Sequence, residues 1–471
     1  MEPFLGIYVH MHWGYNHPYA ARTWTLADWK GYLEGLSRLG YNLVQIWPMI
    51  DTMPSPPTQS DRMHLDKLAR VIDMAKGQYG MRAVVGASAN AMGNASAADY
   101  PFERRPYFRA ERLIDPSKPS DVAELMAARR ELLAPLAQAD GMWILDSDPG
   151  WYEGSPDSEF VMLMLEHRKL LDELRPGIEL VYWMWSGWEE HSFDPQWSAN
   201  PQDTWRRCLV GLRQASPEPW RVNACWPGHF AALAELDLAD KALFFPYNAV
   251  EFEPSLPLTN WDPTPQGHLA RAFESVSGYR YPVGAMGNSQ SHCLQLPHLY
   301  LFKHLAEGGT AETADLASFA RRLYPEAGDR VAAAWKALGG ADPSLMDRLA
   351  TEMEELAQEP SDTGELEGLL FGDAQRLLRD LPPQLRLAAA MRRVPQAEGE
   401  AGRKEALGAV ADALAAWQSV HGFADRPWGR FMDVARVCLA PYVPDLLDEA
   451  HKGDRHGSTL RVLQAIRRAG G

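Results

Sequence analysis

The chain has 471 residues, of which 46% are hydrophobic and 23% are charged, the composition of a globular protein with a large core. Its formal net charge of -16 argues against nucleic acid or an anionic membrane surface as a partner, because both require a basic surface. No apolar run reaches the ~20 residues that a membrane helix needs, and no signal peptide is recognisable.

Eight segments in the first 300 residues predict strands, because each is a short apolar run that ends at Pro, Gly or a polar cluster. These segments are 4–12, 42–47, 82–87, the first part of 141–151, 179–185, 221–226, 242–247 and 283–288. Apolar residues at helical spacing follow most of them, at about 25–36, 61–76, 120–136, 158–174, 201–214, 266–276 and 298–307. Thr25 and Asp28 have the spacing of a capping box at the start of the first helix.

Strands that alternate with helices imply parallel pairing, and eight such units predict a (β/α)8 TIM barrel over residues 1–308. The rival, a doubly wound sheet, would need a glycine-rich phosphate loop after the first strand. The chain has His10-Met11-His12 there instead. Beyond residue 309 the strand signals vanish and helical spacing continues, so we expect residues 309–471 to form a C-terminal all-helical domain. This domain packs on the barrel or mediates assembly of a homo-oligomer.

The active site of such a barrel lies at the carboxyl ends of its strands. In this chain those ends carry aromatic and polar side chains, which suit a ligand with an apolar face and a polar rim, as sugars have. The predicted substrate-binding residues are His10, His12, Trp47, Asn90, Trp185, Trp226, Tyr247, Asn288 and His292. Arg104, Arg105 and Arg109, in the long segment after the third strand, could reach an acidic sugar, although an exposed basic loop is the simpler interpretation.

Asp146 and Asp148 follow the fourth predicted strand, immediately before Pro149 and Gly150. Side chains two apart on a strand share one face, with backbones about 6.6 Å apart. Two like charges so close do not both ionise easily, so one pKa should be raised. This is the chemistry of an acid/base pair, with Asp148, nearer the loop, as the proton donor. Glu189 and Glu190, after the fifth strand, are alternative second carboxylates. The alternative interpretation is that these acids have a structural role, in which they bind backbone amides or cap a helix.

Asp146-Ser147-Asp148-Pro149-Gly150 resembles the acid pairs that follow the fourth strand in barrel glycosidases of the hexosaminidase-like superfamily. Chitinase-like members have a D-x-D-x-E pattern, and here Gly150 stands in place of the glutamate. The N-acetylhexosaminidase families have directly adjacent acids, and here Ser147 separates them. The resemblance covers residues 1–305. It implies a glycoside hydrolase, exo-acting on a small sugar that is N-acetylated or acidic, with carboxylate acid/base catalysis.

Two other functions are consistent with the same residues. His10 and His12 have the H-x-H spacing of amidohydrolase-type metal hydrolases. Such enzymes also need a lysine after the fourth strand and an aspartate after the eighth, where this chain has Asp146 and Asn288. The third possibility is a carbohydrate-binding barrel without catalysis. The four cysteines have neither metal-type nor disulfide-type spacing, so we expect no metal, no cofactor and a reducing, cytoplasmic location.

Overall fold

The computed structural model describes residues 3–12, 16–147, 150–189, 201–246, 267–289, 292–359, 361–421, 430–451 and 458–471. The chain forms two compact units, each made of several segments. The first unit comprises Met1–His12, Gly40–Tyr247 and Arg271–Asn288, and the second comprises Trp13–Leu39, Asn248–Ala270 and Ser289–Gly471. The domain boundary at 308/309 stays a prediction, because the second unit combines segments from before and after it.

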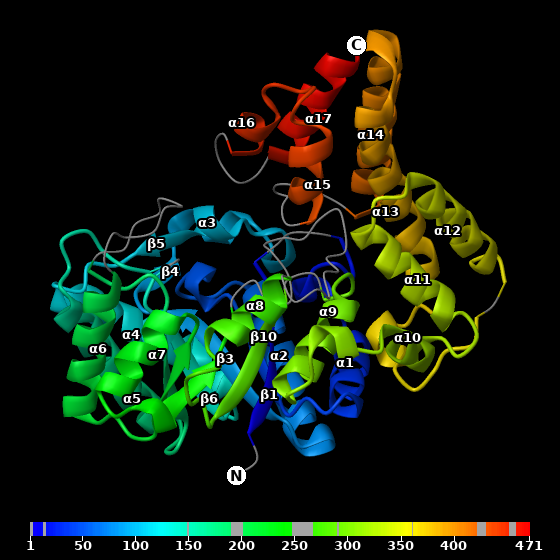
Figure 1. Ribbon diagram of the computed structural model, residues 1–471. Helices are drawn as coiled ribbons and strands as arrows, with labels where there is room; N and C mark the ends of the chain where they lie inside the picture. The colour runs from blue at the N-terminus through cyan, green and yellow to red at the C-terminus, as the bar shows by residue number, and fades with distance from the viewer. Residues whose placement is uncertain are drawn as a thin grey trace. The chain divides into compact units, whose positions relative to one another are not determined.

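The first unit is built on a closed barrel of eight parallel strands, as the sequence predicted (Figure 1). The strands are β1 (Phe4–Val9), β2 (Leu43–Ile46), β3 (Arg82–Ser88), β6 (Gly141–Leu145), β7 (Glu179–Trp183), β8 (Trp220–Ala224), β9 (Ala242–Phe244) and β10 (Gly284–Ser289). Around the barrel their order is β1-β10-β9-β8-β7-β6-β3-β2, so strands that follow each other in the chain are neighbours. The fold class is therefore a (β/α)8 barrel.

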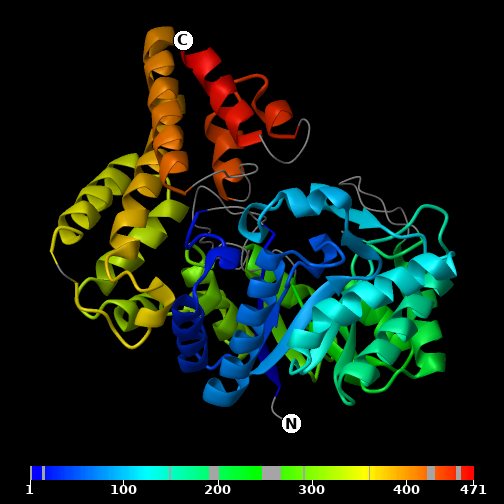
Figure 2. The same ribbon diagram turned by 180° about the vertical axis from the view of Figure 1, so that it is seen from behind.

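Helices lie outside these strands (Figures 1 and 2). They include α2 (Gln59–Tyr79), α4 (Pro119–Leu133), α5 (Asp157–Leu174), α6 (Pro201–Ala215), α7 (Pro227–Glu235) and α8 (His268–Ser275). Thr58 and Asp61 form a capping box at the start of α2, and Gly80 ends the helix with a positive φ of 63°. The sequence did not predict α7, because its first residues, Pro227 and Gly228, are typical of a loop.

The segment between β3 and α4 forms a small insertion rather than an open loop. It contains the antiparallel strands β4 (Ala91–Gly93) and β5 (Glu111–Leu113) and the short helix α3 (Tyr107–Ala110). In Figures 1 and 2 this insertion lies at the end of the barrel where the strands finish. Arg105 anchors it, because its fully buried guanidinium bonds the equally buried Asp61 carboxylate at 2.5 Å. Arg105 is therefore a structural residue and is not available to an acidic sugar.

The second unit is helical. It contains α1 (Leu26–Arg38), α9 (Leu296–Ala306), α10 (Leu316–Leu323), α11 (Gly328–Gly339), α12 (Pro343–Leu356), α13 (Arg376–Arg393), α14 (Gly399–His421), α15 (Arg430–Cys438), α16 (Leu446–His451) and α17 (Ser458–Gly470). The capping box predicted for α1 is present, since Thr25 and Asp28 exchange hydrogen bonds. The helices after residue 309 confirm the predicted helical region. Their predicted apolar positions are buried, for example Phe319, Trp335 and Leu414.

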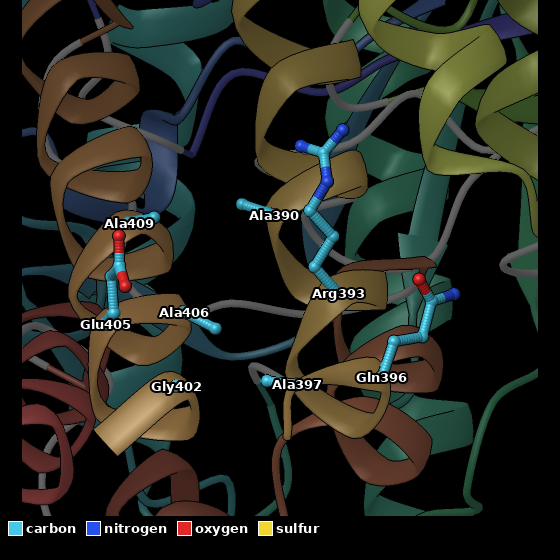
Figure 3. Close-up of a pocket in the computed structure, with 8 residues that line it drawn as sticks. All are labelled: Ala390, Arg393, Gln396, Ala397, Gly402, Glu405, Ala406 and Ala409. Carbon is cyan, nitrogen blue, oxygen red and sulfur yellow. The ribbon is translucent and has the colours of Figure 1, made fainter. Parts of the chain in front are cut away.

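A cavity of about 450 Å³ lies between α13 and α14 in this unit (Figure 3). Its walls are mostly small side chains, and its larger ones are Arg393, Gln396 and Glu405. Arg393 is ion-paired with Asp347 of α12. None of the residues predicted for the active site lines this cavity.

Candidate functional site at the carboxyl ends of the strands

Ring contacts identify the face of each strand that points into the barrel. The rings of Tyr8 and Trp183 lie 5.4 Å apart, and both contact Phe245, at 6.1 and 4.9 Å. These residues come from β1, β7 and the end of β9, which are not neighbours in the barrel. Their side chains can therefore meet only in the interior. Residues that pair with them, or that lie two positions away along a strand, share this inner face.

Three amide side chains on the inner face have no hydrogen-bond partner among the residues that the structure describes. Gln45 pairs in register with Tyr8, and Asn223 pairs with Trp183. Asn288 lies four positions beyond Gly284, which pairs with Leu243, two positions before the inward-facing Phe245. All three residues are 0% exposed, and both polar atoms of each amide lack a partner. A buried polar atom without a partner costs about 1–3 kcal/mol. Each of the three amides lies one residue before the end of its strand, so the interior of the barrel offers donors and acceptors without described partners near the carboxyl ends of the strands.

The end of β1 places two imidazoles side by side at this rim. His12 Nδ1 and His10 Nε2 are 2.6 Å apart, so one ring donates a hydrogen bond to the other. The ring of His12 also lies 3.9 Å from that of Tyr107 and 5.1 Å from that of Trp47. Trp47 is 1% exposed and Tyr107 is 2% exposed. Trp47, predicted to be a wall of the sugar site, thus lies behind His12 as a packed residue.

A second aromatic group lies where β7 and β8 end. The rings of Trp185 and Trp226 are 5.5 Å apart and tilted by 39°. Trp185 is buried, and the indole of Trp205 donates a hydrogen bond to its carbonyl at 2.8 Å. Trp226 is half-buried, so it presents part of its ring to solvent. His229 packs against Trp205, and burial lowers the pKa of His229 to about 3, which keeps that ring neutral.

Asp146 lies at the end of β6, but on the outer face of the strand. Leu145 pairs with the inward-facing Trp183, so Asp146 points the other way, like its bonding partner Tyr182, whose ring contacts Phe160 of α5 at 4.9 Å. The Asp146 carboxylate accepts hydrogen bonds from Ser147 Oγ at 2.8 Å, Tyr182 Oη at 3.0 Å and the Trp185 amide at 3.1 Å. Burial raises the pKa of Asp146 to about 7, although these donors oppose the rise.

The other candidate carboxylates are not brought together with Asp146 by any contact in the described residues. Glu189 is half exposed and pairs with Arg207 at 3.0 Å, and Arg207 also bonds the buried Asp157. Asp148, Glu190 and Tyr247 lie outside the residues that the structure describes. The catalytic roles of these carboxylates, and that of Asp146, therefore stay predictions.

Two further predicted residues have partners that suggest structural roles. The Asn90 amide donates to the carbonyls of Ile114 and Trp151, at 2.9 and 3.1 Å, and so ties the insertion after β3 to the segment after β6. His292 belongs to the second unit, where its Nδ1 lies 3.2 Å from the hydroxyl of Tyr32. Their roles in substrate binding also stay predictions.

Three residues of this rim and interior were not among the predicted substrate-binding residues. Tyr107 lies in the insertion after β3, which the sequence presented as a loop, and nothing local marks it. Gln45 and Asn223 lie within predicted strands, and their inward orientation follows only from the register. A polar amide inside an apolar strand was the one signal that could have identified them.

Among the described residues no group of three or more His, Cys, Asp or Glu side chains could hold a metal ion. No helix within the described ranges is long and apolar enough to cross a membrane.

No protein-family model matches the chain, and no curated protein matches it. Several solved structures are similar in shape. An O-GlcNAc hydrolase from Thermobaculum terrenum is 11% identical, with 99% of this chain and 94% of that chain covered and a TM-score of 0.48. A GH138 enzyme targeting pectin rhamnogalacturonan II is 10% identical, covering 91% and 65%, with a TM-score of 0.47. A chitobiase from Flavobacterium johnsoniae is 13% identical, covering 99% and 78%, with a TM-score of 0.39.

Proposed function

We propose that the chain is a glycoside hydrolase whose site is the carboxyl end of the barrel, exo-acting on a small sugar. One observation carries the proposal: the barrel interior presents three buried amides without partners among the described residues, each one residue before the carboxyl end of its strand. A sugar supplies both the donors and the acceptors that such amides lack. The half-buried indole of Trp226, beside Trp185, adds a flat apolar surface of the kind on which a sugar ring packs.

The proposed chemistry is general acid catalysis by Asp148. Its carboxyl group would give a proton to the leaving glycosidic oxygen, while a second group stabilises the positive charge or activates water. Asp146 supports this role indirectly. Its carboxylate bonds Ser147, which directly precedes Asp148 in the chain, and the Trp185 amide. Asp146 therefore holds the ends of β6 and β7 together, two residues before the proposed donor in the chain.

The test uses the purified full chain and a panel of aryl glycosides that covers both anomers of hexoses, N-acetylhexosamines and uronates. The wild-type chain should release the aryl alcohol from at least one of them. Asp148→Asn should lower kcat about 10³-fold, within the range that general acid catalysis contributes. The matched control is Asp140→Asn, at the opposite end of β6, where Asp140 pairs with Lys76 at 2.8 Å. This control should keep normal kcat.

Each of the other outcomes would favour an alternative function or remove Asp148 from its proposed role. Sugar binding without turnover would make the chain a carbohydrate-binding barrel. A stoichiometric metal ion that is lost in His10→Ala would favour a metal hydrolase instead. Near-normal turnover in Asp148→Asn would remove Asp148 from the role of proton donor.

A further inference from the structure

A buried carboxylate that the proposed chemistry does not use lies directly behind the rim. Asp51 is in the short helix η2 (Ile50–Thr52) after β2 and is 0% exposed. Its Oδ2 accepts a hydrogen bond from the indole of Trp47 at 2.8 Å, and its Oδ1 accepts from the amide and the hydroxyl of Ser88, both at 3.2 Å. The hydroxyl of Tyr107 lies 3.5 Å from Oδ2. Asp51 thus joins the ends of β2 and β3 to the insertion that follows β3.

Arg129 of α4 supplies the opposite charge. Its guanidinium, 2% exposed, lies 3.1 Å from Asp51 Oδ1 and also bonds the carbonyls of Ser88 and Ala91, at 2.5 and 3.1 Å. His167 of α5 lies 2.9 Å from the same guanidinium. Burial and the neighbouring Arg129 lower the pKa of His167 to about 3, so the His167 ring is neutral and accepts this bond. The network around Asp51 therefore contains one anion and one cation, both buried.

The residues that Asp51 holds are those that contact His12. The rings of Trp47 and Tyr107 lie 5.1 and 3.9 Å from the ring of His12. Trp47 and Tyr107 are both buried. His12 contacts these two rings and also His10, its hydrogen-bond partner at the rim. The orientation of the His12 ring therefore depends on two side chains that meet at one carboxylate.

We propose that Asp51 is a positioning residue: through Trp47 and Tyr107 it fixes the imidazole of His12 at the mouth of the barrel, where His12 binds a sugar hydroxyl. Asp51 itself touches no substrate. The part that concerns sugar binding rests on the proposed function. The part that concerns the orientation of His12 does not, so the two are tested separately.

Asp61 offers a matched control within the same unit. Its carboxylate is also 0% exposed and also bonds a fully buried arginine, Arg105. It stabilises the start of α2 and the insertion, and no bond connects it to Trp47 among its described partners. Asp51→Asn and Asp61→Asn therefore remove the same charge from equally buried ion pairs. Only the first replaces the carboxylate that accepts from the Trp47 indole by a neutral amide.

The first experiment needs no substrate. The ring resonances of His12 are identified in the spectrum of the full chain by their loss in His12→Gln. They should shift in Asp51→Asn, because the neighbouring aromatic rings reorient, and should stay in place in Asp61→Asn. Unchanged His12 resonances in Asp51→Asn, or equal shifts in both variants, would overturn the proposal.

The second experiment measures kinetics on whichever glycoside the wild-type chain cleaves. Asp51→Asn should raise KM about tenfold, equivalent to about 1.4 kcal/mol, with kcat within about twofold. In a Trp47→Phe background, which has already lost the indole donor, the same substitution should raise KM less than about twofold further. Additive effects would show that Asp51 does not act through Trp47. If the wild-type chain cleaves no glycoside, the proposed function fails, and the His12 resonances alone decide the role of Asp51.

Discussion

Asp51 and Asp146 are both completely buried acids at the carboxyl ends of barrel strands, but their surroundings differ in one respect. Asp51 has a guanidinium partner, Arg129, in addition to neutral donors. Among the described residues, Asp146 has only neutral donors, from Ser147, Tyr182 and the amides of Trp185 and Gly187. Hydrogen bonds solvate a carboxylate, but they do not neutralise it.

The difference changes what opposes the effect of burial on the pKa of each acid. Burial raises the pKa of Asp51, and Arg129 is the largest of the influences that oppose the rise. For Asp146 nothing but neutral donors opposes burial, and its pKa reaches about 7. The Asp51 network is therefore suited to hold side chains in place as a fixed ion pair. The Asp146 site changes its protonation state under the conditions in which a hydrolase works.

The largest expected effect on stability comes from removing the cationic partner of Asp51, which leaves it, like Asp146, with neutral donors. Arg129→Met leaves the Asp51 carboxylate buried without a counter-ion, and breaking a buried pair in this way costs about 3–5 kcal/mol. Urea unfolding at pH 7 measures the loss. The neighbouring Arg130→Met is the control, because Arg130 forms an exposed pair with Glu173 and should cost about 0.5 kcal/mol at most. Equal losses in the two variants would mean that the buried pair contributes no more than a surface pair.

The second effect concerns the pH dependence of stability. The pKa of Asp146 is 3.8 in the unfolded chain and about 7 in the folded one, so between these values the folded state binds a proton that the unfolded state has lost. The stabilising contribution is thus complete below about pH 4 and is lost as the pH rises towards 7. Between pH 5 and pH 7 the loss is about 2 kcal/mol, because the slope of about 1.4 kcal/mol per pH unit falls to half as the pH reaches the folded-state pKa.

Asp146→Asn tests the predicted loss of stability with rising pH. The variant carries no titrating group at residue 146, so its free energy of unfolding should change less than that of the wild type over the same interval. Denaturant titrations at pH 5, 6 and 7 give the difference between the two curves. Parallel curves would show that Asp146 does not titrate in this range in the folded protein.

The comparison also shows what could be predicted from the sequence. The strand before Asp146 was predictable, because the short apolar run of residues 141–145 ends at acids, Pro149 and Gly150. The alternation along it was predictable as well. Which face points inward was not, because Met142 and Ile144 on one face are as apolar as Trp143 and Leu145 on the other. A parallel strand is buried on both faces, so its hydrophobic pattern does not show which face points into the barrel.

The Asp51 network was unpredictable for a different reason. Its partners Tyr107 and Arg129 are 56 and 78 residues away in the chain. Neither lies in a local pattern that marks an ion pair, and α4 reads simply as an amphipathic helix. Sequence periodicity predicts the barrel because each strand and helix is specified locally. It does not predict which long side chain crosses between elements to meet a buried charge.

A matched pair of substitutions, Tyr182→Phe and Tyr107→Phe, sharpens the comparison, since each removes one hydroxyl from one acid. Tyr182 donates to Asp146 at 3.0 Å, and no cation in the part of the chain that the structure describes pairs with Asp146. At pH 8, where Asp146 is mostly charged, Tyr182→Phe should cost about 2 kcal/mol, as expected for a bond to a charged group. At pH 5 the acid is neutral and the cost should fall to about 1 kcal/mol. A cost that is the same at both pH values would contradict a change of charge at Asp146.

The smallest effect is expected for Tyr107→Phe. The hydroxyl of Tyr107 lies 3.5 Å from Asp51, a long hydrogen bond, and Asp51 keeps Arg129, Ser88 and Trp47 when it is removed. The loss of stability should be about 0.5 kcal/mol, at the low end for a hydrogen bond. It should also depend less on pH than the cost of Tyr182→Phe, because the charge of Arg129 opposes the rise in the pKa of Asp51. Thermal unfolding of both Tyr→Phe variants at the two pH values measures this. A pH-dependent loss for Tyr107→Phe as large as that for Tyr182→Phe would show that Arg129 does not oppose the rise in the pKa of Asp51, and the contrast between the two acids would then be lost.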